Sequence, residues 1–173
     1  QLIACHETVG ISKVELFKKR FLRINPDLEV NAEHCYLTSE NITNFINEKV
    51  DFVIDAIDTV GPKVSLIEFC IKNKVNIISS MGAGGRVDPS MIKYCDIWET
   101  KEDGLARVVR QRLRKIGLRC KLPVVCSMEL PKRYSIIELN EENKRSSFGT
   151  LATIPSLFGI YLANYVIRKL TGI

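Results

Sequence analysis

Two aspartates at the end of a short apolar run are the residues of this chain whose types and spacing are best suited to chemistry. Residues 51–63 read DFVIDAIDTVGPK. Open α/β sheets bind ligands beyond the carboxyl ends of their buried parallel strands, so Asp55 and Asp58 are expected where such a strand gives way to a helix. Two close carboxylates suit Mg²⁺, an ATP phosphate–metal complex or a ribose hydroxyl. The alternative is that they cap the following helix.

A glycine-rich segment is the second candidate for ligand binding. Residues 81–89 read MGAGGRVDP and follow an expected strand directly. Its three glycines allow a backbone to approach a ligand closely, and Arg86 could bind an anion. The segment does not have the spacing G-x-G-x-x-G, so a tight structural turn is an equally good interpretation.

Alternating strand and helix patterns must position these residues. We expect strands at 28–36, 52–57, 75–79, 91–98 and 123–128. Helices are expected at 12–25, 64–73, 105–116 and 156–170, with a short one within 38–48. This order predicts an α/β fold with a Rossmann-like, mainly parallel sheet and flanking helices. Ser12 and Glu15 have the spacing of a capping box, and the polar residues 140–147 suggest a mobile loop.

Composition limits the class of protein. The 173 residues are 46% hydrophobic and 26% charged, which predicts one globular domain over 1–173. The six cysteines include no C-x-x-C pair, which disfavours a zinc knuckle and favours a reducing compartment. We expect the cytoplasm, with an organelle as the alternative. No apolar run reaches the roughly 18 residues that span a bilayer, so stable membrane insertion is not expected.

The charge of the chain permits a polyanionic partner without requiring one. The formal net charge is +5, and the expected helix 105–116 is dense in basic residues. A solvated helix face is the ordinary explanation, although this density could also contact phosphates. The basic residues of this helix are Arg107, Arg110, Arg112, Arg114 and Lys115.

Three stretches, in this order, resemble the E1-like adenylating superfamily, the ThiF/MoeB/HesA group. The first comprises Gln1, HETVGISK at 6–13 and RINP at 23–26. It is similar to the arginine–glutamine pair, V-G-x-x-K turn and R-I-N-P helix end of that family. The second, DAID at 55–58, resembles its D-x-x-D strand tip, and the third is the loop 82–89. DAIDTVGPK, this loop and DGLA at 103–106 look closest to the tRNA threonylcarbamoyladenosine dehydratase branch.

The resemblance implies ATP-dependent activation of a carboxylate. The carboxyl group of threonylcarbamoyladenosine, next to the tRNA anticodon, would be adenylated. Attack by the carbamoyl oxygen would then expel AMP and close an oxazolone ring, which is a net dehydration. Lys13 would neutralise phosphate charge, Asp58 would hold Mg²⁺, and Asp55 would support that ion or fix the strand end. Arg86, Gly82 and Gly84 would meet the acceptor carboxylate or the adenylate.

The resemblance also implies partners and missing parts. It predicts a homodimer, with sulfur-transfer proteins as further partners. The glycine-rich nucleotide loop of the family lies upstream of Gln1, so we expect about one βαβ unit to be absent and ATP binding by this chain alone to be weak. Some relatives carry a catalytic cysteine near 144–148, where this chain has RSS at 145–147. Cys126 is expected in the core, and no catalytic cysteine is assigned.

Three other functions compete with this interpretation. An enzyme that adenylates the C-terminus of a ubiquitin-like sulfur carrier is the first, but such relatives often carry paired C-x-x-C motifs. A non-catalytic Rossmann-like binding module is the second, and it predicts no ATP turnover. An NAD-dependent dehydrogenase is weaker, because the sequence offers no catalytic His or Tyr–Lys constellation.

Overall fold

The structure, a computed structural model, describes residues 3–47, 49–141 and 144–173. The chain divides into two compact units, residues 1–37 and 38–173. The first unit contains the 3₁₀ turn η1 (His6–Thr8) and the helix α1 (Lys13–Ile24). On α1, the rings of Phe17 and Phe21 stack with centroids 5.7 Å apart. Helix α1 ends at Ile24, with Asn25 as its C-cap, because the following Pro26 cannot continue a helix.

Two expectations for the first unit are wrong. Ser12 precedes α1 but makes no capping hydrogen bond, and its buried Oγ has no partner among the described residues. The expected capping box with Glu15 is therefore absent. Residues 28–36 form no strand. Their weak alternation of apolar residues is insufficient, because a strand is stable only when it pairs with a neighbour.

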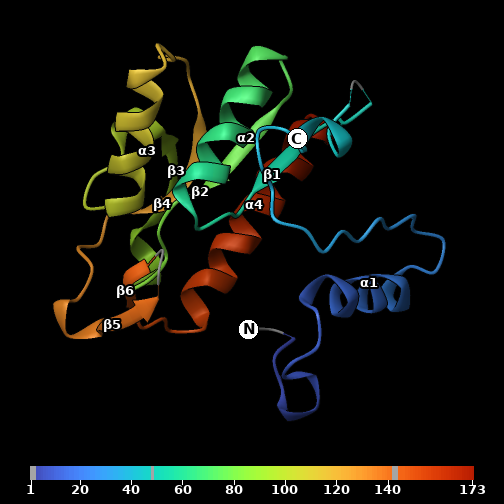
Figure 1. Ribbon diagram of the computed structural model, residues 1–173, viewed down its shortest axis with the longest axis horizontal. Helices are drawn as coiled ribbons and strands as arrows, with labels where there is room; N and C mark the ends of the chain where they lie inside the picture. Colours follow the sequence, from blue (N-terminus) through green and yellow to red (C-terminus); the bar gives the residue numbers. More distant parts are fainter. Residues whose placement is uncertain (1–2, 48, 142–143) are drawn as a thin grey trace. The chain divides into compact units, whose positions relative to one another are not determined.

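A four-stranded sheet forms the centre of the second unit (Figure 1). Its strands are β1 (Val53–Asp55), β2 (Ile77–Ser80), β3 (Ile92–Asp96) and β4 (Pro123–Ser127). They lie in the order β1-β2-β4-β3, with β1, β2 and β4 parallel and β3 antiparallel to β4. The predicted mainly parallel α/β fold is thus confirmed. The carboxyl ends of three strands meet at one edge of the sheet.

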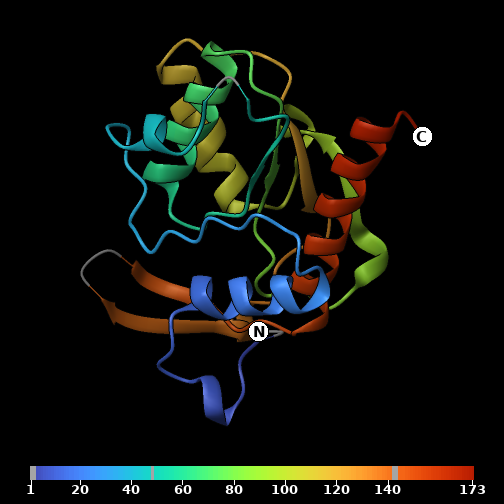
Figure 2. The same cartoon turned by 90° about the vertical axis from the view of Figure 1, so that its right-hand side faces the viewer.

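Helices cover both faces of this sheet. Helices α2 (Val60–Lys72) and α3 (Gly104–Lys115) lie side by side on one face, and α4 (Thr153–Thr171) covers the other (Figures 1 and 2). Helix α4 buries Ile154, Phe158 and Leu162 against the sheet. Burying such side chains contributes about 1.5–3 kcal/mol each. Cys126 of β4 is fully buried, as expected for a core residue.

The polar segment before α4 is a hairpin, so the expected mobile loop at 140–147 is wrong. Strands β5 (Ile136–Glu141) and β6 (Lys144–Phe148) pair antiparallel, and residues 142–143 of the expected loop lie outside the described residues. The short helix expected within 38–48 is only the 3₁₀ turn η2 (Ile42–Asn44). Three further 3₁₀ turns are η3 (Pro89–Met91), η4 (Ile97–Glu99) and η5 (Arg133–Ser135).

A search of the described residues finds no helix with both the length and the apolar character needed to cross a membrane.

Candidate functional site at the carboxyl edge of the sheet

A buried ion pair closes the carboxyl end of β1. Asp55 is the last residue of β1, and Lys63 lies in the first turns of α2; both side chains are fully buried. Lys63 Nζ lies 2.6 Å from Asp55 Oδ2 and also donates to Ser79 Oγ at 3.1 Å and to the Ser80 carbonyl at 2.9 Å. Burial lowers the pKa of Lys63, while the Asp55 carboxylate opposes that shift. The pair joins β1, β2 and α2.

The hydrogen bonds of Asp55 favour the second of its two expected roles. Oδ1 accepts from the Ile57 amide at 2.9 Å, and Oδ2 accepts from Lys63 and Ser79. Asp55 therefore fixes the end of β1 and the turn that follows. Sequence reasoning missed Lys63, although one signal was present: a lysine eight residues after a buried strand aspartate, on a helix that otherwise buries Leu66, Ile67 and Cys70.

Asp58 lies in the turn between β1 and α2, and its side chain is exposed. Thr59 occupies the N-cap position of α2 without a side-chain capping hydrogen bond, so neither aspartate lies at that position. Within the described part of the chain, no three His, Cys, Asp or Glu side chains form a metal cluster. Mg²⁺ bound with nucleotide phosphates needs only one or two protein carboxylates. The exposed carboxylate of Asp58 would suit such an ion, and this role stays a prediction.

Arg86 belongs to the glycine-rich loop, and its side chain is buried. Its exposed fraction is 2%, and Nη1 donates to the carbonyls of Ser127 at 2.7 Å and Glu129 at 2.5 Å. Nη2 donates to the Glu102 carbonyl at 3.1 Å and to Asp103 Oδ2 at 3.2 Å. Burial lowers the pKa of Arg86, and the Asp103 carboxylate opposes that shift. Arg86 thus joins the loop to the end of β4 and to the start of α3.

This placement changes the role expected for Arg86. Both terminal nitrogens are already bound to protein oxygens, and Nε has no hydrogen-bond partner among the described residues. A guanidinium used in this way positions a loop rather than gripping a substrate carboxylate in a bidentate manner. We therefore treat Arg86 as a positioning residue for the loop.

Close packing accounts for the glycines of the loop. The Gly82 amide donates to Asp103 Oδ2 at 2.9 Å, and a Cβ at Gly82 would lie 3.3 Å from Asp103 Oδ1. A Cβ at Gly84 would lie 2.7 Å from Cβ of Phe148, which is closer than real side chains approach. The structural-turn interpretation of this loop is therefore well supported. Ligand binding by Gly82 and Gly84 stays a prediction.

Two acidic residues that sequence reasoning did not assign also hold the loop. Asp103 caps α3 through the Ala106 amide, at 2.8 Å, in addition to binding Gly82 and Arg86. Glu129 Oε2 accepts from the amides of Val87 and Asp88, both at 2.9 Å. The signals were Asp103 before a helix and Glu129 after a buried strand, which are the positions where carboxylates bind free amides.

Lys13 belongs to the unit of residues 1–37. It is the first residue of α1, its side chain is exposed, and it follows a turn in which Gly10 has a φ of +86°. Glycine adopts that backbone conformation without strain. The exposed ammonium and the tight turn are consistent with the phosphate role expected for Lys13, which stays a prediction.

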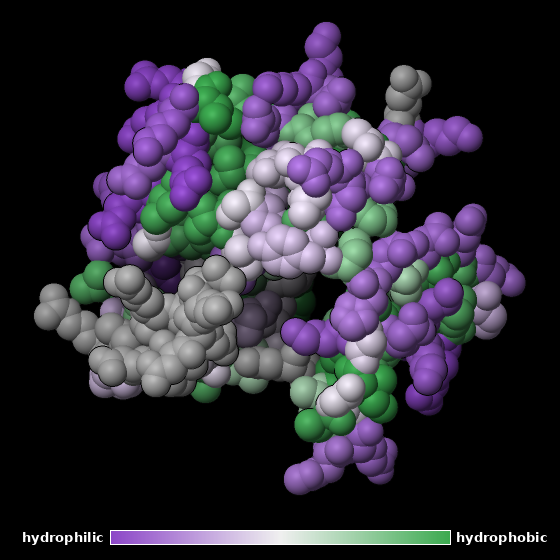
Figure 3. Space-filling view, viewed as in Figure 1, coloured by the Kyte–Doolittle hydropathy of each residue, from purple (hydrophilic) through white to green (hydrophobic). Residues whose placement is uncertain are grey.

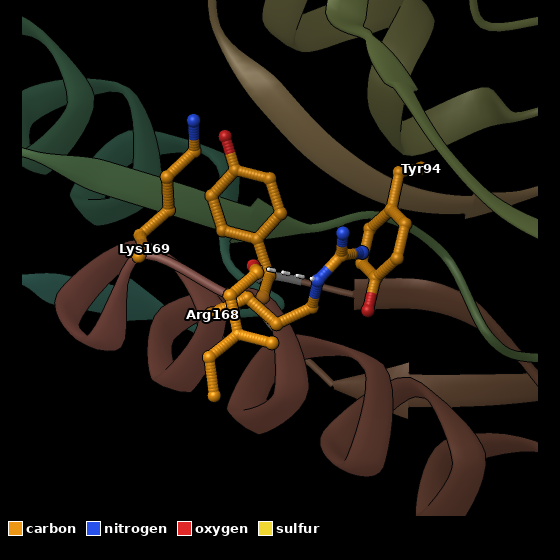
Figure 4. A pocket seen from close by; sticks show the side chains of 6 residues that line it. Tyr94, Arg168 and Lys169 are labelled. Carbon is orange, nitrogen blue, oxygen red and sulfur yellow. Dashed lines mark hydrogen bonds between the residues drawn. The ribbon is translucent and has the colours of Figure 1, made fainter.

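A cavity of about 510 Å³ lies beside the end of α4 (Figure 4). None of the residues at the carboxyl edge of the sheet lines it. Arg168 Nε donates to the Ile173 carbonyl at 3.3 Å, and Lys169 Nζ lies 5.7 Å from the centroid of the Tyr165 ring. The cavity is therefore separate from the candidate site. Its lining residues are Tyr94, Tyr165, Arg168, Lys169, Gly172 and Ile173.

Comparison with known proteins agrees with the fold and the motifs. The tRNA threonylcarbamoyladenosine dehydratase of Bacillus subtilis (strain 168) is 35% identical over 178 residues, which cover 98% of this chain and 70% of the relative. The enzyme of the same name from Escherichia coli (strain K12) is 30% identical over 98% of this chain and 70% of its own length. A crystal structure of E. coli tRNA N6-threonylcarbamoyladenosine dehydratase, TcdA, in complex with ATP matches with a TM-score of 0.88 and 29% identity, covering 99% of this chain and 69% of that chain.

The model of the ThiF family matches residues 1–173. The superfamily resemblance expected from the VGISK, DAID and GAGGRVDP segments is thereby confirmed, and this chain belongs to the ThiF family.

Proposed function

We propose that this protein is an ATP-dependent tRNA threonylcarbamoyladenosine dehydratase. The observation that carries the proposal is the 35% identity to a dehydratase of that name over 98% of this chain. The mainly parallel sheet supports it further, because such sheets bind nucleotides at the carboxyl edge, where this chain gathers its buried polar network.

The proposed reaction has two steps. A carboxylate oxygen of the threonyl group attacks the α-phosphorus of ATP, and pyrophosphate leaves. The carbamoyl oxygen then attacks the activated carbonyl carbon, the carbamoyl nitrogen loses a proton, and AMP departs with the former carboxylate oxygen. One water is lost from the nucleoside overall. Activation is needed because a free carboxylate is a poor electrophile with a poor leaving group.

The site residues contribute position and charge. Asp58 would hold Mg²⁺, which supplies charge neutralisation at the phosphates. The Asp55–Lys63 pair fixes the turn that carries Asp58, so that its carboxylate is placed before the nucleotide arrives. Arg86 holds the glycine-rich loop against β4. We propose that Lys13 adds positive charge at the phosphates.

The test uses the complete protein with ATP, Mg²⁺ and tRNA that carries threonylcarbamoyladenosine, followed by nucleoside mass spectrometry. The expected result is the loss of one water from that nucleoside with release of AMP. Omission of ATP, and tRNA that lacks the threonylcarbamoyl group, serve as controls. AMP release only with a ubiquitin-like protein would replace this proposal by sulfur-carrier activation, and no ATP use with either substrate would favour a binding module.

We further propose that the protein works in the cytoplasm as a homodimer, with sulfur-transfer proteins as additional partners. The six cysteines, all free, support a reducing compartment. The homodimer and the sulfur-transfer partners rest on the family resemblance. Light scattering of the complete protein tests the dimer, and a monomeric mass would contradict it.

A further inference from the structure

The segment from α3 to β4 is strongly basic. Residues 104–128 contain no aspartate or glutamate. The buried face of α3 consists of Ala106, Val109 and Leu113, so the basic side chains occupy the other faces of the helix. Figure 3 shows hydrophilic side chains gathered over α3. We call the exposed members of this group the α3 basic surface; they are Arg107, Arg112, Arg114, Lys115, Arg119 and Lys121.

The charges of this surface are not neutralised by the protein. In the described parts of the chain, none of its six residues takes part in an ion pair. The basic side chains also affect one another: burial lowers the pKa of Arg110, the charges of Arg114 and Arg107 lower it further, and the Asp103 carboxylate opposes this shift. Uncompensated like charges on one helix favour a polyanionic partner over bare solvent.

Part of the surface is held in place by an aromatic ring. The Arg114 guanidinium carbon lies 5.3 Å from the centroid of the Trp98 ring. The Trp98 Nε1 donates to the Cys120 carbonyl at 2.9 Å, so the ring itself is fixed. A guanidinium held in this way loses less conformational freedom when it binds a phosphate. Arg107 lies two turns before Arg114 on the same face, about 10 Å away along the helix.

Helix α3 leads away from the candidate site. Its N-cap, Asp103, also binds Gly82 and Arg86 of the glycine-rich loop. Arg107 is therefore one turn from the carboxyl edge of the sheet, and the remaining basic residues follow over the roughly 18 Å length of the helix. A polyanion that lies along α3 would have one end next to the edge where ATP is proposed to bind.

We propose that the α3 basic surface binds the phosphate backbone of the tRNA and guides the modified nucleoside to the carboxyl edge of the sheet. This inference rests on the proposed function, because it takes the RNA substrate from there. RNA fits better than an acidic protein, because the surface is an extended row of basic side chains that continues beyond the helix to Arg119 and Lys121. Such rows follow a nucleic-acid backbone without needing pockets for side chains.

The experiment measures binding of the complete protein to tRNA over a series of salt concentrations. The variant Arg112→Gln/Lys115→Gln removes two exposed charges of the surface and none of the contacts that hold Arg110 or Trp98. Its control, Lys72→Gln/Lys74→Gln, removes two exposed lysines outside the α3 basic surface: Lys72, which ends α2 and pairs with Glu68, and Lys74 in the turn that follows. We expect the Kd for tRNA to rise roughly tenfold in the first variant, and the slope of log K against log salt to fall by about 2. The control should remain near wild type.

Several outcomes would overturn the inference. One is an unchanged salt slope in the α3 variant; another is an equal fall in both variants. Loss of binding to a ubiquitin-like protein with tRNA binding intact would assign the surface to a protein partner. The Arg107→Gln variant tests whether the end of the α3 basic surface nearest the candidate site also binds tRNA. The KM for ATP should stay unchanged in all variants. If the wild-type protein binds tRNA through α3 but forms no cyclic nucleoside, the proposed function is wrong and the tRNA-binding role of the α3 basic surface is retained. If the α3 variant forms the cyclic nucleoside with an unchanged KM for tRNA, the proposed function is retained and the role of the α3 basic surface is wrong.

Discussion

Lys63 and Arg86 are buried cations that organise the edge of the sheet. Lys63 binds groups at the ends of β1 and β2, and Arg86 binds the carbonyls of Ser127 and Glu129 at the end of β4. A buried charge is tolerated only when it is paired and hydrogen-bonded, so these partners are necessary for folding. The ends of all three parallel strands are thus fixed by side chains before any ligand binds.

The Asp55→Ala variant should be strongly destabilised, because it leaves the Lys63 ammonium buried without its carboxylate. We expect the free energy of unfolding to fall by about 3–5 kcal/mol in urea titrations. Lys72→Ala breaks an exposed ion pair with Glu68 and should cost less than about 1 kcal/mol. Replacement of both partners, Asp55→Leu with Lys63→Met, should recover much of the loss. A single variant as stable as the control would show that the pair is not structural.

The Asp58→Ala variant should separate activity from stability. Asp58 is exposed and its charge favours the protonated form of the buried Lys63, so its loss should lower the free energy of unfolding by no more than about 1 kcal/mol. ATP-dependent formation of AMP with tRNA should fall below detection, because the metal-bound phosphates lose their carboxylate. Rates of AMP formation and urea curves measured on one preparation test both statements. Retained turnover would remove Asp58 from the site.

Sequence reasoning identified the acidic residues of the site more readily than their partners. The DAID segment pointed to the strand end, because the two aspartates directly follow an apolar run. Lys63 was not assigned, since a lysine in a helix is ordinarily exposed. Arg86 was expected to contact the substrate because the sequence does not show its burial. Only the structure shows that the end of β4 brings the carbonyls of Ser127 and Glu129 to its guanidinium.

The glycine-rich loop is the element whose conformation is most constrained. Gly85 has a φ of +72°, and an added Cβ would lie 2.8 Å from Ser135 Oγ and 2.9 Å from Phe148 Cδ1. The loop therefore packs against the β5–β6 hairpin region, and its amides bind Asp103 and Glu129.

Gly85→Ala should destabilise the protein by about 2–4 kcal/mol, because it combines a left-handed backbone with overpacking. Gly104→Ala is the matched control. Gly104 begins α3, and apart from its chain neighbours and the nearby backbone of α3, no heavy atom lies within 4 Å of an added Cβ. That change should be neutral or stabilising by up to about 1 kcal/mol. Thermal unfolding of the two variants tests the difference, and equal melting temperatures would contradict the packing described for the loop.

Glu129 should make the stability of the loop depend on pH. Burial alone would raise the pKa of Glu129, but the amides of Asp88 and Val87 together with the Lys132 ammonium hold the pKa below its ordinary value. Its contribution is therefore present above the unfolded pKa, about 4.3, and is lost as the pH falls through the lower folded value. Glu129→Gln should cost about 1–2 kcal/mol at pH 7 and progressively less in acid. Urea titrations between pH 7 and 3 test this, and a cost independent of pH would contradict it.

Elements with strong apolar patterns could be predicted, and those that depend on distant partners could not. The buried strands and the helices α2, α3 and α4 follow from runs and spacings of apolar residues. Residues 140–147 were expected to be a loop because they are polar and charged, whereas strands β5 and β6 form there by pairing with each other through their backbones. Conversely, residues 28–36 alternate weakly, but no strand in the described part of the chain pairs with them.

The strand order of the sheet and the basic residues of α3 both indicate the carboxyl edge of the sheet as the functional site. The parallel order of β1, β2 and β4 brings their carboxyl ends together. Asp103 connects that edge to α3, whose basic surface extends away from it. A net charge of +5 alone did not identify a polyanion site, because the sequence does not show that the described basic residues between 104 and 128 form no ion pairs.

In the proposed reaction, the threonyl carboxylate of the tRNA becomes an acyl adenylate. The most direct test uses the complete protein, ATP and tRNA whose threonylcarbamoyl carboxylate is labelled with ¹⁸O. Because AMP departs with a former carboxylate oxygen, mass spectrometry should find one ¹⁸O in each AMP and one in the cyclised nucleoside. Unlabelled AMP, or label in inorganic phosphate, would show that the carboxylate is not adenylated and would contradict the account.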